Sequence, residues 1–537
     1  MSNRDVSAHD EAPVLIAGGG LVGLCAAAFL AQRGIRSLAI ERLQASSPLP
    51  RAAFFHMRTM ELFRSLGIED AVRERSADDF VPEGAIIAMD SLSGHKLADI
   101  MPSLNVGVDA LSPCRRLYVN QPTLEPILRE RALAAGATVI QGVEVTDVQQ
   151  DAAGVTVVTT GVASGIQREF RGNYLLAADG GHSKARELLG IPCEGRGVFS
   201  NSLTIYFTAD LSPWIGNNAW SVIYVNNPLL SGFFRMNRTA QAGFLGVNTV
   251  GDYKLDPRAA ADAAADVSES RLIELVRSGV GVPDLKVRID GYSRWRATAN
   301  VAQRFRERRI FLVGDAAHLM PPNGGFGGNT GIHDAHNIAW KLALVIAGHA
   351  GDRLLASYES ERKPIAQFTV EQAFSRYVAR TAPWLKSSQL PEAIVDDLHI
   401  ELGYLYNSPP DTHLDPRTTA GMPGSRAPHL WLTRSGGRVS TIDMVGNYTL
   451  FAGPDGGNWT RAATEAADSF ARLPLDAYCV GKDLGDPEGR FAESYGIATN
   501  GASLVRPDGF IAWRSFDDVA DCCGALRDAL ARSLGVS

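Results

Sequence analysis

A glycine motif near the N-terminus constrains the fold more than any other part of the sequence. The apolar run PVLIA is typical of a buried strand, and three glycines follow it in G-x-G-x-x-G spacing: Gly18, Gly20 and Gly23. An apolar helix over residues 21–32 and a second apolar strand over 37–40 come next, and that strand closes on Glu41. A lone glycine motif can serve helix packing only, but this full βαβ pattern predicts a dinucleotide site with Glu41 on an adenosine ribose.

A second glycine-rich stretch lies further along the chain. Residues 310–313 are apolar and predict a buried parallel strand, and Gly314 and Asp315 follow at the edge of the sheet where ligands collect. Prolines and glycines fill residues 321–328, which suits a backbone that lies close against a flat ligand. The apolar spacing beyond this loop predicts a helix over 334–344, whose N-terminal amides would face the loop and stabilise negative charge.

Two further segments carry candidate ligand contacts. The apolar strand YLLAA ends on Asp179 and Gly180, an ordinary turn by itself that gains weight from the glycine motifs on either side. Gln121 precedes a predicted helix, so its side-chain amide can reach a cofactor from the helix start. Either Arg51 or Arg58 can also touch the cofactor, although a solvated cap or an ion pair is the ordinary role of such arginines.

The sequence pattern changes between residues 193 and 290. Alternating strands separated by Gly, Asn and Pro turns predict an antiparallel sheet inserted into the nucleotide-binding domain, and residues 81–106 alternate in a similar way. Aromatic residues are frequent in the insertion: Tyr206, Phe207, Trp220, Tyr224, Phe233, Phe234 and Phe244. We expect most of them in the core of this sheet, and those that face the loop around Gly324 to line an apolar substrate pocket.

The last part of the chain is set apart by a linker rich in Pro and Gly, at roughly residues 407–425. Beyond it, strands such as RVSTIDMV and YTLFAG, a helix, another strand, a hairpin and a final helix predict a thioredoxin-like domain. The domain contains no CxxC pair, so we expect it to serve packing or dimerisation and not redox chemistry.

Composition argues against several classes of protein. The formal charge of −7 leaves no basic surplus for a nucleic-acid partner, and no run of about 18 apolar residues predicts a membrane span. The polar N-terminus does not resemble a secretion signal. The six cysteines have no metal-type pairing with histidine, so we expect reduced core thiols, no metal site and a cytoplasmic protein.

Together these motifs resemble those of one enzyme family. The order of the first glycine motif, Glu41, Asp179-Gly180 and Gly314-Asp315 is similar to that of the single-component FAD-dependent aromatic hydroxylases, or class A flavoprotein monooxygenases. The resemblance covers the full chain. The C-terminal segments RVSTIDMVG, YGI and GASLVRPDGFIAWR look especially like polyketide tailoring hydroxylases of the aklavinone 11-hydroxylase type, with 2-hydroxybiphenyl and dichlorophenol hydroxylases as catabolic relatives.

The resemblance implies the cofactors and the reaction. FAD would be bound, NADPH or NADH would reduce it, and O2 would add at its C4a carbon. The resulting flavin hydroperoxide would hydroxylate a phenolic or polycyclic aromatic substrate, with a polyketide favoured, so the cofactor carries the difficult steps. The chain contains no second G-x-G-x-x-G, and NAD(P)H is therefore expected to bind transiently, with the flavin moving outward to meet it.

The same resemblance implies the site residues. Those implied for cofactor binding are Gly18, Gly20, Gly23, Glu41, Arg42, Arg51, Gln121, Asp179, Asp315, Pro322, Gly325, Gly328 and Asn329. We expect Gly328 and Asn329 to cradle the flavin pyrimidine, although the loop departs slightly from the commoner GxGxN form. Tyr224 matches a proposed base for the substrate phenol, and Arg380 matches a proposed active-site arginine.

Other functions stay open from the sequence. The same flavin chemistry on a ketone would give Baeyer-Villiger or ring-opening products, and the enzyme could serve phenol catabolism instead of polyketide biosynthesis. A flavin-binding assembly protein without catalysis is the alternative from a different class. His318 and His333 flank the loop, but capping or packing is the ordinary role of such histidines. The chain is expected to be a monomer or a homodimer.

We therefore predict an α/β fold with a Rossmann-like FAD-binding domain, an inserted antiparallel-sheet substrate domain and a C-terminal thioredoxin-like domain. A second long helix, over residues 354–377, is expected in the last FAD-binding piece. The predicted boundaries are 1–80 FAD-binding, 81–106 substrate, 107–192 FAD-binding, 193–291 substrate, 292–406 FAD-binding and 407–537 thioredoxin-like.

Overall fold

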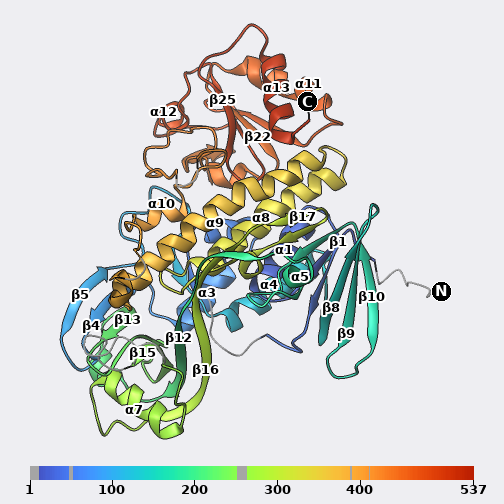
Figure 1. Cartoon of the computed structure of the whole chain (residues 1–537). Helices are drawn as coiled ribbons and strands as arrows, with labels where there is room; N and C mark the ends of the chain where they lie inside the picture. The colour runs from blue at the N-terminus through green and yellow to red at the C-terminus, as the bar shows by residue number, and fades with distance from the viewer. Residues whose placement is uncertain (1–10, 47–52, 251–262, 388–389, 410–411, 537) are drawn as a thin grey trace.

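The computed structural model describes residues 11–46, 53–250, 263–387, 390–409 and 412–536, so Arg51 lies outside the described residues. Figure 1 shows a central α/β unit with an antiparallel sheet below it and a C-terminal unit above it. Two long helices, α8 (Phe326–Ile346) and α9 (Asp352–Arg380), run between these parts. The predicted fold class is confirmed.

The central sheet has six strands, and all but its short edge strand β17 are parallel. In spatial order they are β17 (Arg306–Glu307), β18 (Ile310–Leu312), β11 (Tyr174–Ala177), β1 (Val14–Ala17), β2 (Ser37–Glu41) and β7 (Thr138–Gln141). Apolar runs form the inner strands β18, β11, β1 and β2, because both faces of the sheet are covered there. Since β18, β11 and β1 are neighbours, the turns at Gly314, Asp179 and Gly18 meet at one carboxyl edge.

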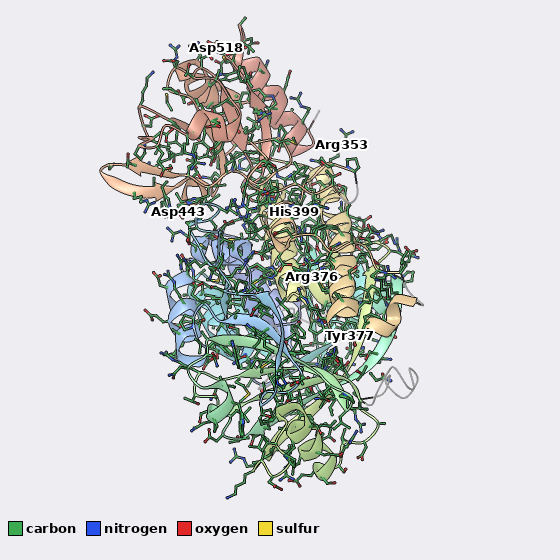
Figure 2. All side chains as sticks on the ribbon, turned by 90° about the vertical axis from the view of Figure 1, so that its left-hand side faces the viewer. Arg353, Arg376, Tyr377, His399, Asp443 and Asp518 are labelled. Atoms are coloured by element: carbon green, nitrogen blue, oxygen red, sulfur yellow. The ribbon has the colours of Figure 1, made fainter. Side chains whose placement is uncertain are left out.

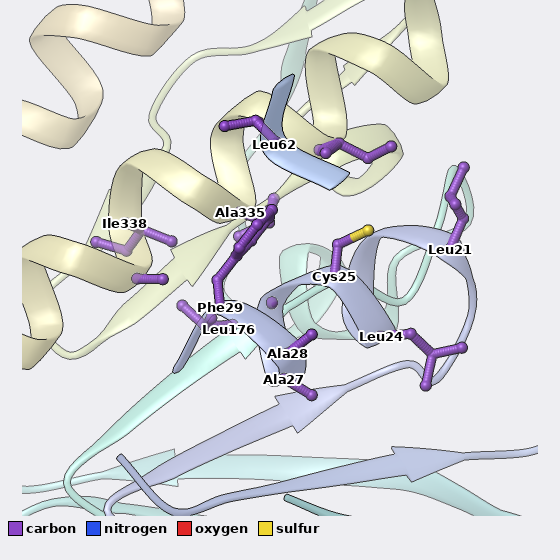
Figure 3. Close-up of a cluster of buried hydrophobic side chains, with 14 of the residues drawn as sticks. Leu21, Leu24, Cys25, Ala27, Ala28, Phe29, Leu62, Leu176, Ala335 and Ile338 are labelled. Atoms are coloured by element: carbon purple, nitrogen blue, oxygen red, sulfur yellow. The ribbon is translucent and has the colours of Figure 1, made fainter. Parts of the chain in front are cut away.

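Helices cover one face of this sheet and a small sheet covers the other. Helix α1 (Leu21–Gln32) is almost wholly buried, since it packs on α4 (Gln121–Ala134) and α8, and Figure 3 shows its Phe29 in one cluster with Ala335 and Ile338 of α8. The opposite face packs against an antiparallel sheet through a second apolar cluster. The strands of that small sheet are β8 (Val143–Gln150), β9 (Val155–Gly161) and β10 (Gln167–Gly172).

The predicted helix over residues 334–344 exists, but it begins well before Asp334. Helix α8 starts at Phe326, directly after Gly325, which has a φ of 69° and no side chain as a cap. Gly331 of this helix lets α1 approach closely, since a Cβ at Gly331 would lie 2.7 Å from Cγ2 of Val22. Part of the predicted glycine loop is therefore the N-terminus of α8.

The substrate sheet has eight strands, paired antiparallel except for β13 with β4. In spatial order they are β19 (His318–Leu319), β16 (Arg288–Ala302), β12 (Cys193–Thr208), β15 (Ala242–Val250), β14 (Leu230–Met236), β13 (Trp220–Asn226), β4 (Ala85–Met89) and β5 (Lys96–Met101). Helix α7 (Glu269–Val280) covers one face, where its Leu275 belongs to the same apolar cluster as Ile223 and Phe234. On the opposite face, Tyr224 of β13 and Ile86 of β4 belong to a smaller apolar cluster with Phe54, Phe80 and Tyr118.

The C-terminal unit has the thioredoxin-like order that the sequence predicts. Its strands are β23 (Leu475–Cys479), β22 (Tyr448–Ala452), β24 (Ala502–Val505) and β25 (Ile511–Ser515), with helices α11 (Gly457–Asp468) and α13 (Cys522–Leu534). The predicted strand RVSTIDMV is only partly a strand, because Ser440 ends β21 (Gly437–Ser440) by capping a 3-10 turn. Asp443 of that turn accepts a hydrogen bond of 2.6 Å from Arg64, and Figure 2 shows Asp443 at the border of the unit.

Buried charges attach the C-terminal unit to the long helices. Arg506 donates to Glu361 of α9 at 2.7 Å, and Lys341 of α8 donates to the same carboxylate at 2.8 Å. Burial alone would raise the pKa of Glu361, but Arg506 and Lys341 outweigh it and hold this pKa well below its usual range. A cavity of about 360 Å³ borders this junction near Arg58 and Asp508, away from the glycine loop.

Short elements connect these parts. They are β3 (Phe54–Phe55), α2 (Met57–Ser65), α3 (Glu69–Asp79), β6 (Leu117–Tyr118), α5 (Lys184–Leu188), α6 (Ser212–Ile215), α10 (Asp397–Glu401), β20 (Trp431–Arg434) and α12 (Phe491–Tyr495). All six cysteines are free, but Cys193 is exposed and so is not a core thiol. Within the described residues, no His, Cys, Asp or Glu cluster could hold a metal, and no helix is both long and apolar enough to cross a membrane.

Candidate active site

The first glycine motif forms a backbone cradle at the end of β1. Gly18 has a φ of 101°, and a Cβ there would lie 2.3 Å from the carbonyl oxygen of Ala178. A Cβ at Gly23 would lie 2.0 Å from the carbonyl oxygen of Gly18. Gly20 begins α1 without a side-chain cap, so the first-turn amides of this helix are open to an anionic group.

Polar side chains surround this cradle. Glu41 lies against it and accepts hydrogen bonds from the amides of Gly19 at 2.7 Å and Leu43 at 2.8 Å, whereas the next residue, Arg42, is exposed. Gln121 begins α4 and donates to Glu125 at 2.6 Å. That pair faces the start of α1, since Oε1 of Glu125 would lie 3.7 Å from a Cβ on Gly20.

Of the two carboxylate oxygens of Asp179, only one accepts a hydrogen bond from the residues that the structure describes. Its Oδ2 accepts a hydrogen bond of 3.0 Å from the amide of Ala185, while its buried Oδ1 has no partner among the residues the structure describes. A buried carboxylate oxygen without a donor is costly. An orphaned acceptor, open helix amides and a cradle that a Cβ would fill are features that fit the hydroxyls and pyrophosphate of FAD.

The second glycine stretch is also held by backbone contacts. Gly324 has a φ of 96°, and its carbonyl oxygen lies 3.0 Å from Nε2 of His56. Asn329 lies inside the first turns of α8, where its amide group donates to the carbonyl of Phe54 at 2.8 Å and its Oδ1 accepts from the amide of His56 at 3.0 Å. The Asn329 side chain is thus engaged within the chain, and backbone groups at the start of α8 are left to face a ligand.

The other residues predicted to bind the flavin lie around this helix start. Asp315 is exposed on a 3-10 turn (Gly314–Ala316) at the end of β18. The exposed Pro322 accepts a hydrogen bond of 3.0 Å from the amide of Gly325. Gly328 is half-buried in the first turn of α8. They surround the start of α8, so a planar ligand there would meet mostly backbone.

A buried carboxylate supports this region from behind. Asp334 accepts hydrogen bonds from Arg362 at 2.7 Å and from the amide of Gly314 at 3.2 Å, and it lies 2.7 Å from Nε2 of His318. Burial alone would raise the pKa of Asp334, but Arg362 and His318 outweigh it and lower that pKa. Burial, with Arg362 close by, holds the pKa of His333 well below its usual range. Both histidines therefore pack within the protein, as expected.

The two catalytic candidates meet at the edge of the substrate sheet. Tyr224 is buried in β13, and its hydroxyl lies 3.4 Å from Nδ2 of Asn323, in the loop before α8. The guanidinium of Arg380, at the end of α9, lies 5.9 Å from the centre of the Tyr224 ring. Ser231 of β14 anchors that end of α9 through a hydrogen bond of 3.1 Å to the carbonyl of Thr381. Three distant segments thus converge on one tyrosine.

A row of rings extends from Tyr224 across the face of the substrate sheet that lies opposite α7. The centre of the Phe233 ring lies 6.0 Å from that of Tyr224 and 5.9 Å from that of Phe244, which lies 6.0 Å from that of Tyr206. We call Tyr206, Tyr224, Phe233 and Phe244 the aromatic face. Phe207 and Phe234 point to the opposite side and belong to the core under α7, where Trp220 packs against them. The expected division between core and substrate-facing rings therefore follows strand alternation.

Comparison with known proteins identifies the family. Residues 11–373 match the family model described as FAD binding domain, and residues 420–537 match the one described as aromatic-ring hydroxylase, C-terminal. The chain belongs to the FAD-dependent aromatic-ring hydroxylases. FAD is thus the cofactor of this chain, and NAD(P)H is the usual reductant of such hydroxylases.

Relatives of this hydroxylase span small and polycyclic substrates. It is 48% identical to a 4-methyl-5-nitrocatechol 5-monooxygenase of Burkholderia sp, over 97% of each chain. A tetracenomycin A2 monooxygenase-dioxygenase of Streptomyces glaucescens is 38% identical, with 98% of this chain and 97% of the relative covered. The crystal structure of aklavinone-11 hydroxylase with FAD and aklavinone has a TM-score of 0.91 and 35% identity, with 100% of both chains covered.

Some residues of the hydroxylase site were not identified from the sequence. Asn323 lies in the predicted loop, but nothing in a Pro-Asn-Gly run indicates that its amide reaches a tyrosine nearly a hundred residues away. His56 and Phe54 come from a segment without any motif. Arg235 could have been noticed from the sequence, because it is a charged residue within the apolar strand SGFFRMN, and the structure places it at a buried position.

Proposed function

We propose that this hydroxylase adds an oxygen atom to a phenolic ring held between its aromatic face and the start of α8. The observation that carries the proposal is the convergence of Tyr224, Asn323 and Arg380 beside the glycine loop. The aromatic face supplies a flat apolar surface, and the polar groups at its edge suit a ring that bears a hydroxyl.

In this proposal backbone groups hold the cofactor. The first glycine motif and Glu41 would bind the adenosine and pyrophosphate, with Arg42, Gln121 and Asp179 nearby, and the start of α8 would bind the flavin ring. Bound FAD, reduced by NAD(P)H, supplies the transfer of one oxygen atom from O2. The proposed residues around the flavin are Asp315, Pro322, Gly325, Gly328 and Asn329. Arg51, which lies outside the described residues, is also proposed to contact FAD.

Tyr224 is proposed to relay the proton of the substrate phenol: its hydroxyl oxygen accepts that proton while its own hydroxyl proton passes to water. Nδ2 of Asn323 faces the oxygen of its hydroxyl at 3.4 Å, which orients this group. The ring of a phenolate is a better nucleophile than the ring of a phenol, so it reacts faster with an electrophilic oxygen. The positive charge of Arg380 would stabilise the negative charge that develops on the substrate oxygen.

The substrate class follows from what the relatives share. A nitrocatechol is a small phenolic ring, whereas aklavinone and the tetracenomycins are polycyclic, and the chain is 48% identical to the enzyme of the first kind against 38% for one of the second. We propose that the substrate is an aromatic compound with a phenolic hydroxyl, and both a substituted catechol and a polyketide meet this requirement.

A product analysis tests the proposed function. The FAD-loaded protein would be supplied with NADPH or NADH and isotopically labelled O2, together with simple phenols, nitrocatechols and anthracyclinones. We expect one labelled oxygen atom on an intact ring and NAD(P)H oxidation that the aromatic compound stimulates. A product with an opened or expanded ring would favour Baeyer-Villiger chemistry. NAD(P)H oxidation that no aromatic compound stimulates, with no oxygenated product, would favour the assembly protein.

Several finer points belong to the same proposal. We keep the three-domain division at the predicted boundaries, a monomer or homodimer, and a cytoplasmic location, where NAD(P)H is supplied. The NADPH or NADH preference would come from the same product assay, run with each reductant in turn.

A further inference from the structure

One buried cation in the substrate sheet forms no ion pair with the residues that the structure describes. Arg235 lies in β14 and is only 7% exposed, yet its Nε and Nη2 atoms have no hydrogen-bond partner among the described residues. Those residues also place no carboxylate within ion-pair distance of it. Buried charges are normally paired, because removing them from water without compensation is costly.

The surroundings of Arg235 are aromatic. Its guanidinium carbon lies 4.4 Å from the ring centre of Phe80 and 4.5 Å from that of Tyr118. Such contacts stabilise a cation by about 0.5–2 kcal/mol, but they do not satisfy its N–H donors. Burial lowers the pKa of Arg235 to about 10, which still leaves the side chain positively charged at neutral pH.

Arg235 belongs to the aromatic side of the sheet and not to the core under α7. Phe234 points into that core, so by strand alternation Phe233 and Arg235 point to the other side. Phe233 pairs directly with Tyr224 across the strands, which makes Arg235 a diagonal neighbour of Tyr224, with a separation of about 7–8 Å.

Arg235 is also connected, through neighbouring rings, to the start of α8. The Tyr118 ring beside Arg235 stacks on Phe54 with 4.9 Å between ring centres. A Cβ on Gly325 would lie 3.0 Å from the Cβ of Phe54, at the start of α8. Arg235 therefore lies at the rear of the region where the proposed function puts the substrate ring.

We infer that Arg235 binds an anionic oxygen of the substrate, a phenolate on the part of the ring system away from Tyr224. This inference rests on the proposed function and narrows its substrate class to acidic phenols with at least two oxygen substituents. One oxygen would lie at Tyr224 and the other, already ionised, would accept hydrogen bonds from the unpaired N–H groups of Arg235.

A binding titration with 4-nitrocatechol tests this inference. The FAD-loaded protein would be titrated without NAD(P)H, and the visible absorbance of the probe would report whether it binds as the phenolate. We expect wild type to bind the phenolate in preference to the ether methylated at the acidic hydroxyl. Arg235→Met should weaken phenolate binding about 10- to 100-fold and leave binding of the ether within about twofold, and Arg235→Lys should recover part of the loss.

Arg238→Met is the matched control, since Arg238 is exposed just beyond β14. It should bind both probes as wild type does. Equal affinity of wild type for the phenolate and the ether would overturn the inference, and so would equal loss of both probes in Arg235→Met. The proposed function fails separately: phenolate selectivity with no hydroxylated product from any phenol would overturn that proposal and leave the anion site standing.

Discussion

The proposed cofactor half and the proposed substrate half of this hydroxylase are built in different ways. At the cofactor half, glycines bring backbone amides together: Gly18 and Gly23 have no room for a Cβ, and α1 and α8 begin without side-chain caps. At the substrate half, side chains from separate segments meet, as Tyr224 and Arg380 do. Backbone recognition requires one local sequence pattern, whereas side-chain recognition requires the tertiary fold.

This difference explains how relatives can share FAD and yet act on different rings. The backbone cradle tolerates few substitutions at Gly18 and Gly23, because an added Cβ at either position meets a carbonyl oxygen. On the aromatic face, Tyr206, Phe233 and Phe244 are half-exposed and Tyr224 is buried. A changed side chain at these strand positions leaves the ladder of hydrogen bonds intact. Substitutions in the two halves should therefore have effects of different kinds and sizes.

The largest effect is expected from Gly23→Ala. The new Cβ would lie 2.0 Å from the carbonyl oxygen of Gly18, so we expect a loss of at least about 3 kcal/mol in stability and no FAD in the purified protein. Gly20→Ala is the control, since the nearest atom to its Cβ would be 3.7 Å away. Thermal unfolding of the FAD-free proteins should separate them, and equal melting temperatures would break the comparison.

Asp334→Asn should have the next largest effect. The substitution leaves Arg362 buried without its charge partner, which costs about 3–5 kcal/mol, whereas Asp70→Asn in an exposed pair should cost no more than about 1 kcal/mol. Because the folded pKa of Asp334 is lowered, its contribution is present above the unfolded value of about 3.9 and is lost as the pH falls through the folded pKa.

Urea unfolding at a series of pH values measures this contribution. Between about pH 5 and pH 3, the free energy of unfolding should fall more steeply in wild type than in Asp334→Asn. This result would show that the proposed cofactor half also depends on one buried side chain. That side chain is Asp334, which accepts a hydrogen bond from the amide of Gly314. Parallel curves for the two proteins would contradict this role.

The smallest effect is expected on the aromatic face. Phe233→Leu removes one ring of the row but keeps an apolar side chain, so substrate binding should weaken by about 1 kcal/mol, or about fivefold, with FAD affinity unchanged. Phe516→Leu, at an exposed position, is the control. The dissociation constant of the substrate with oxidised enzyme measures the change, and a loss of FAD from Phe233→Leu would show that the halves are not separable.

The sequence was most informative where recognition is local. The βαβ unit with Glu41, the strand before Asp179 and the strand before Gly314 were all predicted, because each motif follows directly from an apolar run. The start of α8 was predicted too late in the chain, since its first turns are rich in Gly and glycine normally disfavours helices. Close packing of Gly331 against α1 overrides that preference.

Contacts that depend on tertiary structure were less predictable. The approach of Tyr224 to Asn323 depends on how the substrate sheet rests on the central unit, and no spacing in the sequence encodes that distance. Tyr224 was named from the sequence pattern as one aromatic residue of the insertion, but its catalytic role and that of Arg380 came only from resemblance to a family. Arg235 could have been recognised as a charged residue in an apolar strand, but only the fold shows that two of its nitrogen atoms have no hydrogen-bond partner in the described part of the chain.

The most direct test of the division between the two halves is hydroxylation by FAD-loaded Tyr224→Phe, measured across pH. We expect FAD affinity equal to wild type, a kcat lowered about 100-fold or more, and recovery of the rate as the pH rises and the substrate phenol ionises without help. Tyr292→Phe, exposed on the same sheet, should behave as wild type. A wild-type rate in Tyr224→Phe, or a loss of FAD from it, would contradict the division.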